Sequence, residues 1–146
     1  MIRLTSKLHG PGKASATLTL PWERRTRSRL RVALDNGFEA GLFLTRGAIL
    51  RGGDLLAAED GMVVQVRAAD EPLSSVVCGD ALKMARVCYH LGNRHAALEI
   101  RPGEIRYLRD PVLDALVQGL GLTVAHVAAP VEPEMGAYAG HGHAHE

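Results

Sequence analysis

The sequence predicts an α+β protein: an N-terminal all-β domain (residues 1–71), a ferredoxin-like βαββαβ domain (residues 72–130) and a flexible histidine-containing tail (residues 131–146). Three observations predict this organisation. Apolar and polar residues alternate between glycine-containing turns in the first half, which is typical of strands. Helical spacing of apolar residues begins after Glu71, and the apolar pattern ends after Pro130.

The composition indicates a folded protein with two small aliphatic cores. Aromatic residues make up only 4% of the 146 residues, so the cores must consist of Leu, Val, Ile and Ala. Small domains bury a low fraction of their surface and are marginally stable alone. Pairing with a second copy of the chain is therefore expected to help.

The first domain is expected to contain short strands joined by tight turns. Arg27–Leu34 alternates most clearly, with Leu30 and Val32 on one face. Asp35-Asn36-Gly37 supplies the positive-φ residues of a hairpin turn after it. No helix longer than one turn is predicted here. The other expected strands are Ala16–Leu20, Phe38–Leu44, Ala48–Leu50 and Met62–Arg67.

The other face of the Arg27–Leu34 strand is basic. It carries Arg27, Arg29 and Arg31, and Arg24 and Arg25 lie just before it. Such a face is suited to an acidic partner, although the solvated outer face of a half-buried sheet explains it equally well. Nucleic acid is not expected as a partner, because aromatic residues for base stacking are nearly absent and the formal net charge is only +1.

The second domain is predicted from its order of strands and helices. Asp80 is expected to cap a helix that runs to Leu91 and stops at Gly92. Asp110, followed by Pro111, is expected to cap a second helix. The expected strands are Leu73–Cys78, Ala96–Ile100, Glu104–Leu108 and Leu122–Val127. The expected buried helix positions are Leu82, Ala85, Cys88 and Leu91, then Leu113, Leu116, Val117 and Leu120.

The sequence does not predict an enzyme, and no catalytic residue is assigned. It contains no GxSxG, HExxH or CxxC motif, and Gly12-Lys13 lacks the remaining residues of a phosphate-binding loop. Asp110 and Asp114 share a helix face, but a cap and a favourable helix-dipole interaction explain them. No apolar run is long enough to cross a membrane, and no secretion signal is evident, so a cytoplasmic protein is expected.

The tail carries alternating histidines that suit a metal ion. His141, His143 and His145 are separated by Gly142 and Ala144, and imidazole binds nickel, copper and zinc. An accidental polar tail is the alternative. Sites on a flexible tail should be weak and exchangeable, because binding must order the chain.

His95 is a second candidate ligand. If it opens the Ala96–Ile100 strand, its side chain points away from the helices, onto the uncovered face of the sheet. One imidazole does not hold a transition metal unaided, but a two-fold dimer contact would bring a second His95 to it. His90 is interpreted as a helix-dipole partner, and His126 and His9 remain unassigned.

The ordered motifs resemble the UreE family of urease accessory proteins, which are nickel metallochaperones. The most specific segments are Tyr89-His90-Leu91-Gly92-Asn93-Arg94-His95 and Arg106-Tyr107. Leu20-Pro21-Trp22-Glu23-Arg24-Arg25 precedes them, and Glu132-Pro133-Glu134 follows them. The resemblance covers the chain from about Leu20 into the tail.

The resemblance implies a peptide-binding-like β domain, a metal-binding and dimerisation domain, and delivery of Ni(II) to urease. It implies nickel ligation by His95 at the homodimer interface and by the tail histidines, with Cu(II) or Zn(II) as possible substitutes in vitro. The implied partners are the urease apoprotein and its activating GTPase complex. Two alternatives stay open: a general metal buffer without a urease role, and a peptide-binding folding chaperone.

Overall fold

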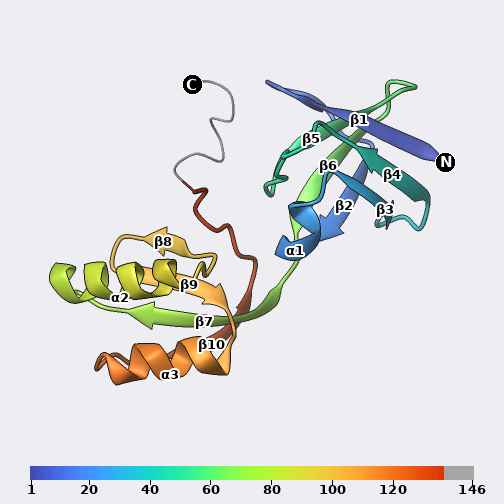
Figure 1. Cartoon of the computed structure of the whole chain (residues 1–146). Coiled ribbons are helices and arrows are strands. Elements are labelled where there is room, and N and C mark those ends of the chain that lie inside the picture. Colours follow the sequence, from blue (N-terminus) through green and yellow to red (C-terminus); the bar gives the residue numbers. More distant parts are fainter. Residues whose placement is uncertain (137–146) are drawn as a thin grey trace. The chain divides into compact units, whose positions relative to one another are not determined.

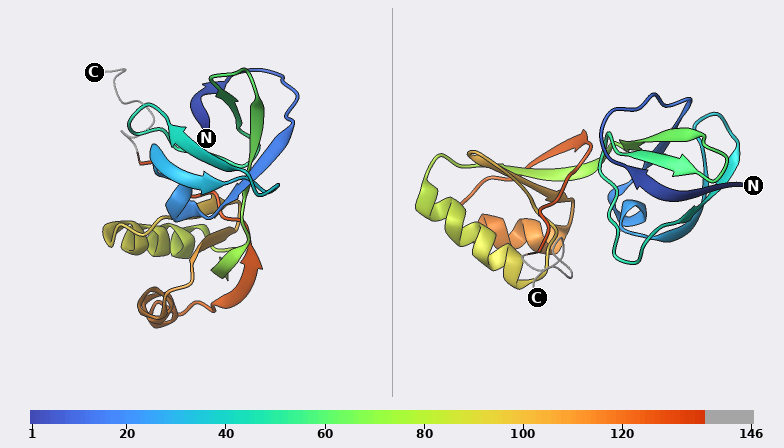
Figure 2. Two further views of the ribbon diagram at one scale, coloured as in Figure 1. Left: turned by 90° about the vertical axis from the view of Figure 1, so that its right-hand side faces the viewer. Right: turned by 90° about the horizontal axis from the view of Figure 1, so that it is seen from above.

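The computed structural model describes residues 1–136 and divides the chain into two compact units, Met1–Ala69 and the part from Asp70 onward (Figures 1 and 2). The first unit is built almost entirely of strands, and the second combines a sheet with two helices. The predicted α+β class, with an all-β domain before a ferredoxin-like domain, is confirmed. None of the helices in the described residues has the length and apolar character required to span a membrane.

The first unit is one six-stranded sheet with the strand order β2-β6-β5-β1-β4-β3. Two of its pairings are parallel, β1 with β4 and β2 with β6, and the other three are antiparallel. The elements are β1 (Ile2–Leu8), β2 (Ala16–Leu20), the single-turn helix α1 (Trp22–Arg25), β3 (Arg29–Ala33), β4 (Glu39–Phe43), β5 (Leu55–Ala58) and β6 (Val63–Ala68). An aliphatic core that includes Leu4, Leu42 and Val64 holds the sheet together.

Local sequence patterns predicted most strands and turns of this unit, but two strands were missed and one predicted strand was wrong. The Asp35–Gly37 turn is confirmed: Gly37 has φ 93°, and the N–H of Leu34 donates to the carbonyl oxygen of Phe38. The sequence interpretation missed β1 and β5. The predicted strand Ala48–Leu50 is wrong, because this segment is a loop in which the buried Leu50 donates its N–H to the carbonyl oxygen of Arg25.

Arg25 does not belong to the basic surface. Its side chain is fully buried, and its Nε donates to the carbonyl oxygen of Leu20 at 3.1 Å. Its guanidinium also lies 5.3 Å from the ring centroid of Trp22. The sequence interpretation counted Arg25 as exposed because a buried arginine that caps backbone carbonyls leaves no local pattern.

The second unit is a four-stranded antiparallel sheet with the order β10-β7-β9-β8. In chain order this is fourth, first, third, second, the ferredoxin-like arrangement. The elements are β7 (Glu71–Val77), α2 (Ala81–Asn93), β8 (Glu99–Arg101), β9 (Glu104–Leu108), α3 (Pro111–Gly119) and β10 (Ala125–Ala129). Val87 of α2 and Val117 of α3 pack with Val76 and Tyr107 of the sheet into one core.

Both helices begin where the sequence predicted. The carboxylate of Asp80 accepts the N–H of Lys83, and that of Asp110 accepts the N–H groups of Val112 and Leu113. The buried stripe of α2 differs from the prediction, however. It consists of Met84, Val87, Cys88 and Leu91, whereas Leu82 is 59% exposed and Ala85 is also exposed. Apolar residues at helical spacing occur on two faces of α2, and the sequence pattern did not show which one packs.

The first residues of the predicted tail lie against the second unit. Val131 is fully buried. The N–H of Glu132 donates to Oε1 of Glu99 at 2.9 Å, and the N–H of Glu134 donates to the carbonyl oxygen of Leu98 at 2.6 Å. The sequence predicted a tail from residue 131, but these hydrogen bonds anchor its beginning to the edge of the sheet next to β8. The tail histidines lie outside the described residues.

Candidate metal site

His95 lies in the turn that ends α2, not in a strand as predicted. Strand β8 begins only at Glu99. The N–H of His95 donates to the carbonyl oxygen of Gly92 at 2.9 Å, and the N–H of Ala96 donates to that of Leu91 at 3.1 Å. These two bonds define a Schellman C-cap in which His95 takes the position just after the capping residue, Arg94.

The backbone of His95 is left-handed, which is unusual for a residue with a side chain. Its φ is 60°, and it is the one non-glycine residue with positive φ among residues 1–136. Glycine normally fills this position, because a Cβ there costs about 1–2 kcal/mol. The sequence interpretation assigned the stop to Gly92, but α2 continues through Asn93. A histidine in a backbone conformation that favours glycine suggests the hypothesis that its imidazole has a function.

The local field at His95 favours a positive charge. The last carbonyl groups of a helix carry a partial negative charge, which stabilises cations near its C-terminal end. His95 is exposed to solvent, so its ring is accessible to an incoming ion. Within residues 1–136, no group of three or more His, Cys, Asp or Glu side chains is arranged to hold a metal ion. The described part of a single chain therefore offers His95 without a complete ligand set.

The neighbours of His95 on α2 are poorer candidate ligands. Cys88 packs against the core, and this burial raises the pKa of its thiol and disfavours the thiolate that binds metals. His90 is exposed in the last turn of α2, with its ring edge-on to that of Tyr89 at 5.2 Å between centroids. Its position fits the predicted favourable interaction with the helix dipole.

An exposed apolar stripe runs along α2 opposite the core. Leu82, Ala85 and Tyr89 are spaced three and four residues apart, so they share one face of the helix. Leu82 is 59% exposed and Tyr89 is 66% exposed. Large apolar side chains gathered on one exposed helix face are typical of an interaction surface. This stripe leads along the helix toward the turn that carries His95.

The anchored segment after Val131 is hydrogen-bonded to the loop that follows His95, and the histidine tail continues from this segment. Glu134 is hydrogen-bonded to Leu98, which follows His95 by only three residues. Glu99 accepts the other anchoring bond from Glu132, and its Oε2 is held by Nε of Arg101 at 2.6 Å. His141, His143 and His145 themselves lie outside the described residues, so their placement stays a prediction.

A separate polar cluster surrounds Asp114, which the sequence interpretation explained only by the helix dipole. Oδ1 of the buried carboxylate accepts hydrogen bonds from the hydroxyl groups of Ser74 at 2.7 Å and Tyr107 at 2.6 Å. Its other oxygen lies 2.9 Å from Nε2 of His126, a residue that the sequence left unassigned. The sequence did hold one signal for the burial of Asp114. It lies three residues before the buried Val117 and therefore on the packed side of α3.

The pKa values of Asp114 and Tyr107 in this cluster are shifted in opposite directions. Burial alone would raise the pKa of Asp114, but the hydrogen bonds from Tyr107, Ser74 and His126 hold it below its ordinary value. Burial, together with the hydrogen bond and charge of Asp114, raises the pKa of Tyr107. The cluster stabilises the packing of α3 on the sheet, because every buried polar group in it has a partner.

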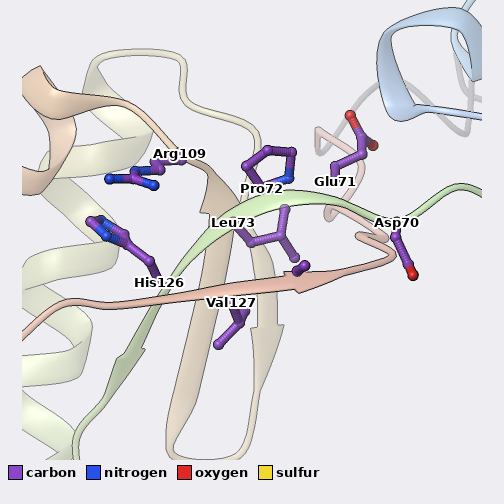
Figure 3. A pocket seen from close by; sticks show the side chains of 8 residues that line it. Asp70, Glu71, Pro72, Leu73, Arg109, His126 and Val127 are labelled. Carbon is purple, nitrogen blue, oxygen red and sulfur yellow. The ribbon is translucent and has the colours of Figure 1, made fainter.

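His126 also borders an open pocket at the start of β7 and along β10. Figure 3 shows its ring beside the guanidinium of Arg109, with Pro72 and Leu73 farther along the pocket. The lining contains no second imidazole, and His95 is not part of it. His126 is thus engaged with Asp114 and is separate from the candidate metal site.

Comparison with known proteins matches both units to one family. The family model described as UreE urease accessory protein, N-terminal domain, matches residues 2–69, and that described as its C-terminal domain matches residues 71–146. A urease accessory protein UreE of Alkalilimnicola ehrlichii is 55% identical over 140 residues, covering 96% of this chain and 86% of its own.

Two further relatives agree with this match. The urease accessory protein UreE of Pseudomonas putida is 53% identical over 148 residues, covering 98% of this chain and 90% of its own. That of Tolumonas auensis is 54% identical over 143 residues, covering 94% of this chain and 76% of its own. The identity extends over both units and far exceeds what a shared fold alone would give. The chain therefore belongs to the UreE family of urease accessory proteins.

Proposed function

We propose that this protein is a cytoplasmic nickel carrier that delivers Ni(II) during urease maturation and is not itself an enzyme. The ion is its cargo. The urease apoprotein and its activating GTPase complex are the proposed recipients. Membership of a urease accessory family supports this assignment. The structural observation that carries it is the exposed His95 imidazole held on a left-handed helix cap.

The proposed site forms between two copies of the chain. In a two-fold dimer the same surface faces itself, so a single His95 becomes a pair of imidazole ligands. The exposed stripe of Leu82, Ala85 and Tyr89 supplies the apolar contact that such pairing requires, on the helix that ends at His95. Two imidazoles leave the coordination of nickel incomplete, which allows the ion to be transferred readily.

The tail histidines are proposed to complete and load this site. Five residue steps separate Gly136, the last described residue, from His141. A fully extended chain of that length spans at most roughly 18 Å. Because Glu134 is held beside Leu98, the tail begins near His95, which raises the local concentration of its imidazoles at the site. Cu(II) and Zn(II) are expected to bind the same ligands in vitro, because imidazole discriminates weakly among these ions.

The central test compares His95→Ala with His90→Ala, a change of another exposed histidine five residues away. Nickel titration by calorimetry should show loss of the tightest component in His95→Ala and no more than a twofold change in His90→Ala. Activation of apo-urease by each nickel-loaded variant should follow the same order. Unchanged nickel stoichiometry and urease activation in His95→Ala would exclude this site.

Pairing is tested independently by sedimentation of the metal-free protein at micromolar concentration. We expect a dimer for the wild-type chain and a shift toward monomer for Tyr89→Asp, which puts a charge into the apolar stripe. A wild-type monomer with or without nickel would contradict the shared site. Nickel binding with no effect on urease activation would instead favour a general metal buffer.

A further inference from the structure

The outer face of β1, β4 and β3 carries an aromatic ring among arginines. These strands are neighbours in the sheet, as Figure 1 shows. Arg3, Gly41 and Arg31 form one cross-strand row, and Phe43 faces Arg29 in the next row of β4 and β3. We call these five residues the arginine platform. It lies in the first unit, whereas His95 lies in the second.

Gly41 allows the ring of Phe43 to lie over the strand. A Cβ at position 41 would be 2.6 Å from Cε2 and 3.2 Å from Cζ of Phe43, so any other residue there would force the ring to move. Glycine in the middle of a strand weakens it, since it adds no packing and loses more entropy on folding. At position 41 this loss of stability is offset, because only glycine leaves room for the phenyl ring to lie over the strand.

The ring in turn positions two guanidinium groups. Cζ of Arg3 lies 4.0 Å from the ring centroid, and Cζ of Arg29 lies 5.6 Å from it. Both distances are within the range of cation–π attraction. The arginines are therefore partly ordered before any partner arrives, which lowers the entropy cost of binding.

Two of the three arginines on this face form ion pairs, and both pairs are exposed to solvent. Arg3 pairs with Glu59 at 3.2 Å and Arg31 with Glu39 at 3.6 Å, but all four side chains are at least 47% exposed. Such exposed pairs are weak and exchange readily for other carboxylates. Within residues 1–136, Arg29 forms no ion pair. Guanidinium groups bind carboxylates in a bidentate geometry that lysine does not reproduce.

From this arrangement we propose that the arginine platform docks an acidic segment of a protein partner. Carboxylates of that segment bind Arg29 and displace the weak pairs of Arg3 and Arg31. A nucleic acid fits less well, because the ring lies too close to Gly41 to leave room for a Cβ and the Arg3 guanidinium lies 4.0 Å from its centroid, which leaves less of the ring for a base to stack on. The surface acts independently of nickel binding at His95.

The test measures binding of a fluorescein-labelled decaglutamate peptide to the full-length protein by fluorescence anisotropy at low salt. Arg29→Glu should weaken binding at least about fivefold, because it replaces attraction with repulsion in the middle of the platform. The matched control is Arg67→Glu, an exposed arginine on β6, which β5 and β1 separate from β4. It makes the same charge change and should weaken binding less than twofold.

Two conservative variants separate the platform from net charge. Arg29→Lys keeps the charge but loses the bidentate fork, and Phe43→Leu keeps every charge but loses the ring. Each should weaken peptide binding about two- to threefold, while the matched change Arg67→Lys should have no effect. Nickel titration should be unchanged in all of these variants, so this proposal and the nickel proposal can fail separately.

Three results would overturn the proposal. The first is equal loss of binding in Arg29→Glu and Arg67→Glu, which would show only non-specific attraction. The second is wild-type affinity in both Arg29→Lys and Phe43→Leu. The third is tighter binding of a single-stranded RNA oligonucleotide than of decaglutamate, with the same dependence on Arg29, which would identify a nucleic-acid surface.

Discussion

The backbone of His95 combines two requirements in one residue. The end of α2 needs a left-handed residue to satisfy its last carbonyl groups, and the proposed site needs an imidazole at that point. Histidine tolerates the left-handed region better than most residues with a side chain, although less well than glycine. The position is therefore expected to be suboptimal for stability and retained for binding.

Substitution of His95 should separate stability from binding. In metal-free protein, His95→Gly should be more stable than His95→Ala by about 1 kcal/mol, because only glycine relieves the left-handed strain. Both variants should lose the tight nickel component equally. Chemical denaturation with a chelator present measures the first difference, and calorimetry the second. Equal stability of the two variants would argue against a strained cap.

Asp114 should stabilise the second unit in a pH-dependent manner. Asp114→Ala leaves the buried hydroxyls of Ser74 and Tyr107 without their acceptor and should cost about 2–4 kcal/mol at pH 7. The folded protein lowers the pKa of Asp114 from its ordinary value of 3.8, so this stability is present above that value and is lost as the pH falls through the lower folded value.

The measurement is urea denaturation of both proteins between pH 7 and pH 3. The difference between wild type and Asp114→Ala should be constant near neutral pH and should shrink below about pH 4. Tyr107→Phe is the control, since it removes one hydrogen bond and leaves no buried group unpaired, and should cost only about 1 kcal/mol. A difference that stays constant down to pH 3 would contradict the role of the ionised carboxylate.

At the scale of elements, α2 has two apolar faces that serve different purposes. Met84, Val87, Cys88 and Leu91 hold the helix on the sheet, whereas Leu82, Ala85 and Tyr89 remain exposed. The segment around Glu134 is bonded to the residues where β8 begins: the N–H of Glu134 donates to the carbonyl oxygen of Leu98, and the N–H of Glu132 donates to Oε1 of Glu99. Both features converge on the turn between α2 and β8, where His95 lies.

The Glu99 carboxylate should control how firmly the segment after Val131 is held. Glu99→Ala removes the acceptor for the N–H of Glu132, so exchange of that amide hydrogen should accelerate at least about tenfold. Loosening the segment lengthens the effective linker to the tail histidines and should weaken tail-assisted nickel binding about twofold. Hydrogen exchange by mass spectrometry and nickel titration measure these effects.

Glu99→Gln is the matched control, because its amide oxygen still accepts this hydrogen bond. It should retain most of the protection at Glu132 that Glu99→Ala loses. Protection that is identical in all three proteins would show that the carboxylate does not anchor the segment.

The two units and the tail of the chain carry different proposed sites. The second unit carries the proposed shared metal site, the first unit carries the arginine platform, and the tail carries additional imidazoles. The basic side chains thus gather on a part of the chain that is not needed to bind the cation.

Truncation after Gly140 should reduce the number of bound nickel ions but retain the interface site. The three tail histidines are lost, while His95 and the anchored segment remain. Nickel per chain, measured by equilibrium dialysis, should therefore fall without abolishing the His95-dependent component. A shortened chain that binds no nickel at all would show that the tail forms the primary site.

Features that depend on residues a few positions apart could be predicted from the sequence. The caps Asp80 and Asp110, the turn at Gly37 and the strands of the βαββαβ domain follow from local geometry, and all are present. The family motif also singled out His95, although its backbone conformation was misjudged because Gly92 carried the usual signal for a helix stop.

Features that join distant parts of the chain became evident only in the folded structure. It placed β1 between β4 and β5, buried Arg25, joined Asp114 to His126 and anchored Glu132 on Glu99. It also selected which of two apolar faces of α2 packs inward. These outcomes depend on which surfaces fill the core together and which polar groups find partners there, and neither property belongs to any one segment of the sequence.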